Sequence, residues 1–196
     1  MKKLFNSLAC ALLLLTSYHS NAAFITLEAD QASYNVGDTV TVDLNVSGFE
    51  QLLGGFFAEL LYSPLQLTLQ SWQFGQGFDD GLGSYQWHSH DAANGILQLD
   101  DYADFSADTS LLLTQQGSMF TLVRLSFSAL TAGQFDLGLL ASGTGLLSFN
   151  NDYLPLTLQG TTINVVNTTQ VPLPATALLF ASGLVLLPRQ RKTKNG

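Results

Sequence analysis

Alternating apolar and polar residues are the feature of this sequence that most limits its fold. Residues 39–46 carry valine or leucine at every second position, namely Val40, Val42, Leu44 and Val46, with polar residues between them. This period of two is typical of a β-strand that buries one face. Residues 121–129 repeat the pattern, and no long stretch between residues 24 and 170 keeps a helical period. The sequence therefore predicts an all-β domain.

Turn-forming residues separate the alternating runs. Gly37 and Asp38 precede the first run, and Ser47 and Gly48 follow it. Further predicted strands cover 24–29, 55–62, 65–74, 95–100, 135–139, 146–149 and 161–166. Many short strands with turns of this kind indicate a sandwich. We expect residues 24–166 to form a single jelly-roll β-sandwich of about nine strands.

The charged residues are divided between an acidic body and two basic ends. All 15 acidic residues lie between Glu28 and Asp152, whereas six of the 7 basic residues lie in the first three or the last eight positions. Arg124 is the only lysine or arginine between residues 24 and 170, so the net charge of −8 for the whole chain understates the acidity of the body. Such a balance excludes nucleic acid as a partner and disfavours polyanionic ligands unless a cation bridges the charges.

The N-terminus has the pattern of a secretory signal peptide over residues 1–22. Two lysines, Lys2 and Lys3, precede a short apolar run at residues 8–15. Small residues before the expected cleavage point favour cleavage after Ala22, with Ala23 as the near alternative. The pattern predicts export through the Sec pathway. The only cysteine, Cys10, lies inside this segment, so the mature chain has no disulfide.

The C-terminal segment, residues 171–196, has three parts. A proline-containing motif is followed by an apolar stretch at 175–187 and by a cluster of basic residues within 189–194. The motif consists of Val171, Pro172, Leu173, Pro174 and Ala175, and the cluster of Arg189, Arg191, Lys192 and Lys194. The apolar stretch predicts a single helix of about 20 Å, which is shorter than the hydrocarbon core of a bilayer. Counted from Val171, the segment reaches the lower limit for a span. The basic cluster would stay on the cytoplasmic side.

This segment resembles the PEP-CTERM sorting signal in its VPLPA variant. The resemblance implies recognition by an exosortase, an integral-membrane protease or transpeptidase, in a Gram-negative bacterium. The precursor would be held transiently in the inner membrane, and the processed protein would reach the cell surface or the medium. A plain C-terminal membrane anchor remains the alternative. Residues 167–170 form a polar linker between the body and this tail.

Three stretches of the body resemble the cohesin family. Residues 34–44 resemble its first long strand with a V-G-D entry turn, and residues 53–65 its next strand and Y-D-P turn, with Ser63 in place of aspartate. Residues 120–133 resemble its late strand and glycine turn. The resemblance implies a nine-stranded jelly-roll sandwich that acts as a binding module. Cohesins of cellulosomes bind dockerin helices.

Aromatic residues concentrate in the central third of the chain. Tyr85 and Trp87 are flanked by glycine, serine and histidine, so we expect them in a loop, where exposed rings could stack on the sugars of an extracellular polysaccharide. Trp72 and Phe74 lie on a predicted strand and are expected in the core.

Acidic residues are densest at Asp100, Asp101, Asp104 and Asp108. Aspartates at short spacing can supply the oxygen ligands of Ca²⁺, although the EF-hand spacing is absent. The alternative is an acidic loop that keeps the protein soluble and protects sheet edges. His88 and His90 would share one face of an extended segment, but a zinc site needs further ligands.

The sequence has no G-x-S-x-G motif and no cysteine in the mature body, and we expect no enzymatic activity. The leading interpretation is an exported surface or matrix protein with one cohesin-like binding or structural module. Two alternatives stay open: a carbohydrate-binding module, and a module that recognises a protein partner in the manner of cohesin and dockerin.

Overall fold

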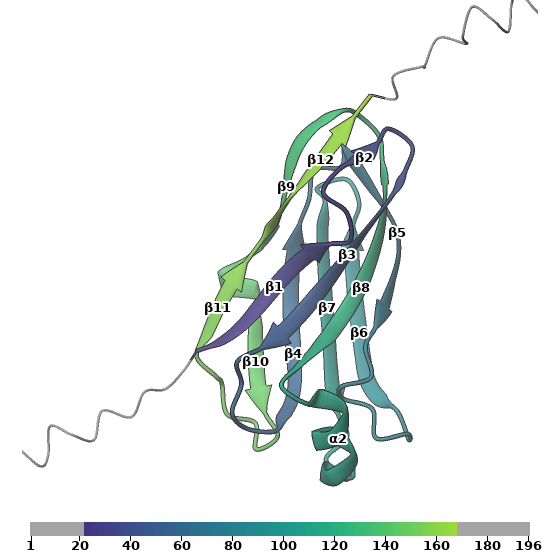
Figure 1. Ribbon diagram of the computed structural model, residues 1–196. Helices are drawn as coiled ribbons and strands as arrows, with labels where there is room; N and C mark the ends of the chain where they lie inside the picture. Colours follow the sequence, from purple (N-terminus) through teal and green to yellow (C-terminus); the bar gives the residue numbers. More distant parts are fainter. Residues whose placement is uncertain (1–21, 168–196) are drawn as a thin grey trace, which may run out of the picture.

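The computed structural model describes residues 22–167, which form a β-sandwich of two facing sheets with a short helix at one end (Figure 1). The expected all-β sandwich is confirmed. The described residues contain twelve strands rather than about nine, because several are short edge or bridging segments. The predicted C-terminal helix, residues 175–187, lies outside the described residues.

The first sheet has five strands. Their order is β11 (Leu156–Gln159), β1 (Ala23–Ala29), β3 (Thr39–Ser47), β8 (Met119–Ala129) and β5 (Leu67–Phe74). β1 pairs in parallel with β11, whereas the other neighbours are antiparallel. β1 therefore lies between β3, from the first part of the described chain, and β11, from its last part.

The second sheet has seven strands. Their order is β2 (Tyr34–Asn35), β12 (Thr161–Val166), β9 (Gly133–Leu139), β4 (Leu53–Leu61), β7 (Ile96–Ala103) and β6 (Ser84–Asp91), and β10 (Gly145–Ser148) pairs with β4 beside this path. β6 pairs only with β7 and so forms one edge of the sheet.

Alternate residues of both sheets fill the space between them. On β3 the predicted inward residues Val40, Val42 and Leu44 are fully buried. They face residues of the second sheet such as Phe56 on β4, whose ring stacks on Phe78 at a centroid distance of 5.9 Å. The expected core positions of Trp72 and Phe74 hold in part, since both are partly buried and pack against this core.

Two side-chain contacts link residues of β6 to the sandwich. Trp72 of β5 and His88 of β6 approach each other with a ring-centroid distance of 4.5 Å. The hydroxyl of Tyr62 lies 2.7 Å from Nε2 of His90. The two histidines therefore share one face of the strand, as their spacing predicted, and that face is turned toward the first sheet.

The helix α2 (Thr109–Gln116) was not predicted from the sequence. Asp108 caps its first turn by accepting a hydrogen bond from the Ser110 amide, and Gly117 ends it at a φ of 52°. Gln116 is buried, accepts a hydrogen bond from the Leu53 amide and donates to the Leu53 and Gly77 carbonyl oxygens, each at 2.9 Å. One amide side chain thus fastens the helix to β4 and to the loop before β6.

The first and last strands lie close to the two limits of the described chain. β1 begins at Ala23, and β12 ends at Val166 at the end of the sandwich opposite α2 (Figure 1). No helix within residues 22–167 is both long enough and apolar enough to cross a membrane. The expected signal peptide, apart from Ala22, and the whole expected sorting tail, with its motif at 171–175 and its basic cluster, lie outside the described residues.

Candidate binding surface

Tyr85 and Trp87 lie on the edge strand β6 and not in a loop, which corrects the expectation from their neighbours. Their side chains share the face of β6 that points away from the first sheet, and they are 68% and 43% exposed. Because a strand turns successive side chains to opposite faces, Tyr85 and Trp87 point outward while His88 and His90 point inward. Their predicted exposure is therefore correct.

The neighbouring strands add aromatic residues to the same face. Tyr85 lies opposite Tyr102 of β7, and Trp87 lies opposite Asp100. Asp100 in turn lies opposite Phe57 of β4. Phe57, Tyr85, Trp87, Tyr102 and Tyr153 are here called the outer aromatic face; the ring of Tyr153 meets that of Phe57 edge-on, with centroids 6.3 Å apart.

Two glycines provide the space in which two of these rings lie. A Cβ added at Gly55 of β4 would overlap the ring of Tyr102, and one added at Gly145 of β10 would overlap the ring of Phe57. Each ring therefore lies against bare backbone of the neighbouring strand. The sequence contains both glycines, but their role depends on a strand register that only the structure provides.

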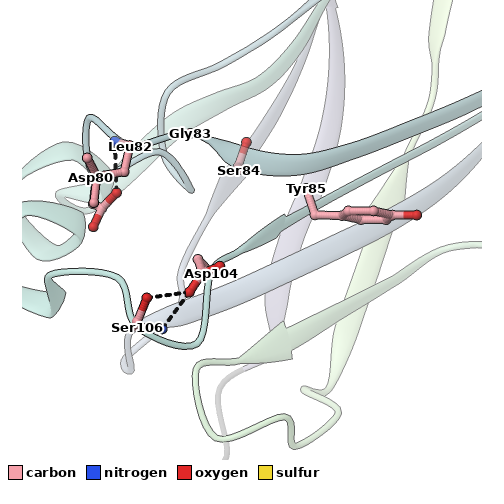
Figure 2. Close-up of a pocket in the computed structure, with 7 residues that line it drawn as sticks. All are labelled: Asp80, Leu82, Gly83, Ser84, Tyr85, Asp104 and Ser106. Carbon is pink, nitrogen blue, oxygen red and sulfur yellow. Dashed lines mark hydrogen bonds between the residues drawn. The ribbon is translucent and has the colours of Figure 1, made fainter.

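The surface around these rings is hollowed in two places. One depression of about 330 Å³ is lined by residues that include Phe57, Glu59, Trp87, Asp100 and Tyr102. A second of about 360 Å³ is lined by Asp80, Leu82, Gly83, Ser84, Tyr85, Asp104 and Ser106 (Figure 2). Tyr85 borders the second depression, and Tyr102, opposite it on β7, borders the first. The two depressions therefore lie next to each other along β6 and β7.

The carboxylate of Asp100 lies between Trp87 and Phe57. Its side chain is half-buried, and burial raises the pKa of Asp100 above its usual value. No hydrogen bond or ion pair to this carboxylate is formed by the residues that the structure describes. Burial also raises the pKa of Tyr102, and the charge of Asp100 raises it further.

Glu59 and Gln98 flank Asp100 on the side away from Tyr102. The Gln98 amide donates a hydrogen bond of 2.9 Å to Oε2 of Glu59, and the Glu59 side chain packs against Gly143 of the short 3-10 helix at Ala141–Gly143. Rings with a neighbouring carboxylate and amide can bind a cation, a sugar or a polar protein side chain.

The four aspartates proposed to bind Ca²⁺ do not converge. Asp100 points outward and Asp101 inward, because they are adjacent on β7. Asp104 accepts hydrogen bonds from the Ser106 amide and hydroxyl, and Asp108 accepts the same pair from Ser110. In the described part of the chain, no group of three or more acidic, histidine or cysteine side chains is placed to hold a metal ion.

Asp101 is the most unusual of these residues. Its side chain is fully buried, and neither carboxylate oxygen has a hydrogen-bond partner. Burial raises the pKa of Asp101 to about 6. The polar side chains of Ser84 and Gln86, although outside hydrogen-bonding geometry, lower this pKa, and the negative charge of Asp79 raises it. Its inward position continues the alternation of Leu97 and Leu99, which is the signal in the sequence that could have identified it.

The only lysine or arginine of the described chain lies on the other sheet. Arg124 of β8 forms two hydrogen bonds to Asp43 of β3, from Nε at 2.7 Å and from Nη2 at 2.8 Å. β8 and β3 belong to the five-stranded sheet. Within residues 22–167 the outer aromatic face is therefore acidic and has no cationic side chain of its own.

Similar solved structures include several cohesin domains. A type II cohesin domain from the cellulosome of Acetivibrio cellulolyticus has a TM-score of 0.63 at 19% identity, covering 73% of this chain and 95% of that chain. A non-cellulosomal cohesin from the archaeon Archaeoglobus fulgidus has a TM-score of 0.57 at 13% identity, covering 76% and 94%.

A chain from a type I cohesin–dockerin complex of Clostridium thermocellum has a TM-score of 0.59 at 9% identity, covering 74% of this chain and 100% of that chain. No protein-family model and no curated protein matches the sequence. At such low identities, the likeness establishes the fold alone. Residues 22–167 form a cohesin-like β-sandwich.

Proposed function

We propose that this chain is an exported surface or matrix protein whose cohesin-like sandwich is a non-catalytic binding module. The outer aromatic face is its binding surface. The observation that carries this proposal is the exposure of Tyr85 and Trp87 beside a half-buried carboxylate on one sheet face. Exposed aromatic side chains beside hollows in the surface are typical of sites that bind another molecule.

A protein partner is the first candidate. The fold resembles cohesin domains, some of which were solved in complex with dockerins. The outer face of an antiparallel sheet is also a stable platform, because its backbone is fixed by pairing on both sides of β7 and β4. Trp, Tyr and Arg are the residues that contribute most to protein interfaces, and two of these three types are present here.

A polysaccharide is the second candidate, and the stacking area offered by Tyr85 and Trp87 favours it. Glu59, Gln98 and Asp100 could hydrogen-bond to sugar hydroxyls beside these rings. The acidic surface would select neutral or amino-bearing sugars over polyanionic ones.

Export and sorting complete the proposal. Support for cleavage after Ala22 comes from β1, which begins at the next residue. Ala23 is buried, and its amide donates a hydrogen bond of 2.9 Å to the Pro155 carbonyl oxygen. Cleavage after Ala23 would remove a buried residue from β1, so the alternative is disfavoured. The tail at 171–196 directs sorting by an exosortase, on its resemblance to the PEP-CTERM signal.

Two experiments test the proposal. The intact mass of the protein exported by its native host should correspond to a chain that begins at Ala23 and lacks residues 171–196; a mass that retains the tail contradicts the sorting claim. For binding, the mature protein and a Tyr85→Ser/Trp87→Ser variant are used to capture ligands from the host's medium and from a glycan array. Capture that the variant retains in full contradicts the assignment to this face.

A further inference from the structure

The position of Asp100 raises the question of what balances its charge. Trp87 and Phe57 lie directly across from it on the two neighbouring strands, and Tyr102 is the next outward residue of β7. These three rings are called the aromatic cradle. The residues described offer Asp100 no hydrogen-bond donor and no cation. A carboxylate that has lost part of its water and has no partner is stabilised by any cation that reaches it.

The rings around Asp100 are suited to the same kind of ligand. The face of an aromatic ring attracts a cation, and tryptophan does so most strongly. The depression lined by the aromatic cradle, Asp100 and Glu59 has a volume of about 330 Å³ and opens to solvent. It is therefore large enough for the end of a long side chain. The two carboxylates and the rings all favour a positive charge at that point.

Charge complementarity narrows the class of ligand further. The described chain carries 15 acidic residues and Arg124 as its only lysine or arginine, and Arg124 is paired with Asp43 on the other sheet. No basic side chain of residues 22–167 can reach the cradle from the same face. The remaining lysines and arginines lie at positions 2–3 and 189–194, which the mature chain lacks under the proposed function. The cation then comes from another molecule. An acidic surface also accelerates association with a basic partner.

The adjacent depression favours a protein over a sugar. Its lining includes Leu82, which is 91% exposed, at the opposite side from Tyr85 (Figure 2). An aliphatic side chain offers a sugar no hydrogen bond, whereas it packs readily against the apolar side chains of a protein. The two neighbouring depressions could thus hold a basic and an apolar residue of one peptide segment.

We infer that Asp100 and the aromatic cradle of Phe57, Trp87 and Tyr102 bind an arginine side chain of a protein partner. This inference rests on the proposed function, since it assumes that the outer aromatic face is the binding surface. Arginine is favoured over lysine because its flat guanidinium group stacks on Trp87 while donating two hydrogen bonds to one carboxylate.

The test uses a pair of peptides that differ only in charge. Acetyl-Gly-Arg-Gly-amide is titrated into the exported protein, and its citrulline counterpart has nearly the same shape without the positive charge. Binding is followed by backbone amide chemical shifts. We expect saturable shifts around Trp87, Asp100 and Tyr102 with the arginine peptide, weaker ones with a lysine peptide, and none with the citrulline peptide. The arginine affinity should fall as salt is added.

Matched variants assign the effect to Asp100. Asp100→Asn keeps the shape of the side chain and should weaken arginine binding at least about tenfold. Glu28→Gln removes one negative charge from the opposite sheet and should leave the affinity unchanged. Equal binding of the arginine and citrulline peptides, or full binding by Asp100→Asn, would overturn the inference.

A third arm distinguishes a protein from a cationic sugar. Glucosamine oligomers and neutral glucose oligomers are titrated in the same way. Tighter binding of either oligomer than of a peptide that carries two arginines would overturn the choice of a protein partner. If ligand capture from the medium depends on Tyr85 and Trp87 but not on Asp100, this inference fails while the proposed function stands.

Discussion

The buried carboxylate of Asp101 makes folding stability depend on pH in a direction opposite to that of most aspartates. Burial, as the largest cause, raises its pKa from 3.8 to about 6 in the folded protein. The folded state therefore binds the proton more tightly than the unfolded state does. The contribution of Asp101 is most favourable below pH 3.8, where both states are protonated, and is lost as the pH rises through about 6.

The size of the effect follows from the two pKa values. A difference of about two pKa units corresponds to about 3 kcal/mol once both states are ionised. Roughly 1 kcal/mol of this should be lost between about pH 5 and 7, where the folded protein gives up its proton. Asparagine has nearly the shape of the protonated acid and cannot ionise. Asp101→Asn should therefore be more stable than the parent protein at pH 7.5, by ~1–3 kcal/mol.

The assay is urea unfolding of both proteins at several pH values from 4.5 to about 8, with the difference in unfolding free energy plotted against pH. Comparing the two proteins removes the contribution of every other titrating group. Asp104→Asn is the contrasting control, because hydrogen bonds from Ser106 lower the pKa of Asp104 and its charged form favours the folded state. The reasoning would be refuted if the difference in unfolding free energy between Asp101→Asn and the parent stayed constant with pH, or if the parent were the more stable protein at pH 7.5. Either result would mean that Asp101 is not a buried carboxylate without a partner.

Two further predictions concern the framework of the binding surface. Gln116→Leu should destabilise the protein by roughly 2–4 kcal/mol in urea unfolding, because it leaves the Leu53 amide, the Leu53 carbonyl and the Gly77 carbonyl without the partner that they share; an unchanged midpoint would contradict this. Gly95→Ala should cost at least about 1–2 kcal/mol, since Gly95 has a φ of 66° in the β6–β7 turn and an added Cβ would overlap the Tyr62 carbonyl. Gly138→Ala, where an added Cβ would meet nothing, is its control and should stay within about 1 kcal/mol of the parent.

The strands that bury one face could be predicted from the sequence. Over residues 39–44 of β3 and 123–129 of β8, alternate residues are buried, so the apolar positions repeat every second residue. The alternation breaks where the register between the two strands shifts after Leu44. β12 was predicted with its observed bounds, residues 161–166. In each case one face of the strand is buried and the other contacts water, so apolar and polar residues alternate in the sequence.

The sequence of the elements that were not predicted, β6 and α2, shows no regular spacing of apolar residues. β6 is an edge strand with most residues exposed on both faces, so nothing forces apolar and polar residues to alternate along it. α2 carries Leu111, Leu112 and Leu113 in succession, but only Leu112 and Gln116 are buried. Its one buried leucine and one buried glutamine do not form an apolar stripe, and the helix depends on its cap and on the hydrogen bonds of Gln116.

The candidate surface was predictable only in part. Tyr85 and Trp87 were identified from the sequence as exposed aromatic residues, although their strand was not. Phe57, Tyr102 and Tyr153 were not identified, because their contribution depends on the register between β4, β7 and β6 and on the glycines beneath two of the rings. Asp100 was identified for a Ca²⁺ site shared with Asp101, whereas the pleat of β7 points the two carboxylates in opposite directions.

The central claim is that the protein binds its partner through the outer aromatic face. Site-specific photocrosslinking tests it most directly, with a photoreactive phenylalanine analogue placed at position 85 on β6 or at position 73 on β5. Both positions are exposed, and they lie on edge strands of opposite sheets. We predict that the protein exported into the host's medium forms a discrete adduct from position 85 and none from position 73. Adducts from position 73 alone, or from neither position, would contradict the claim.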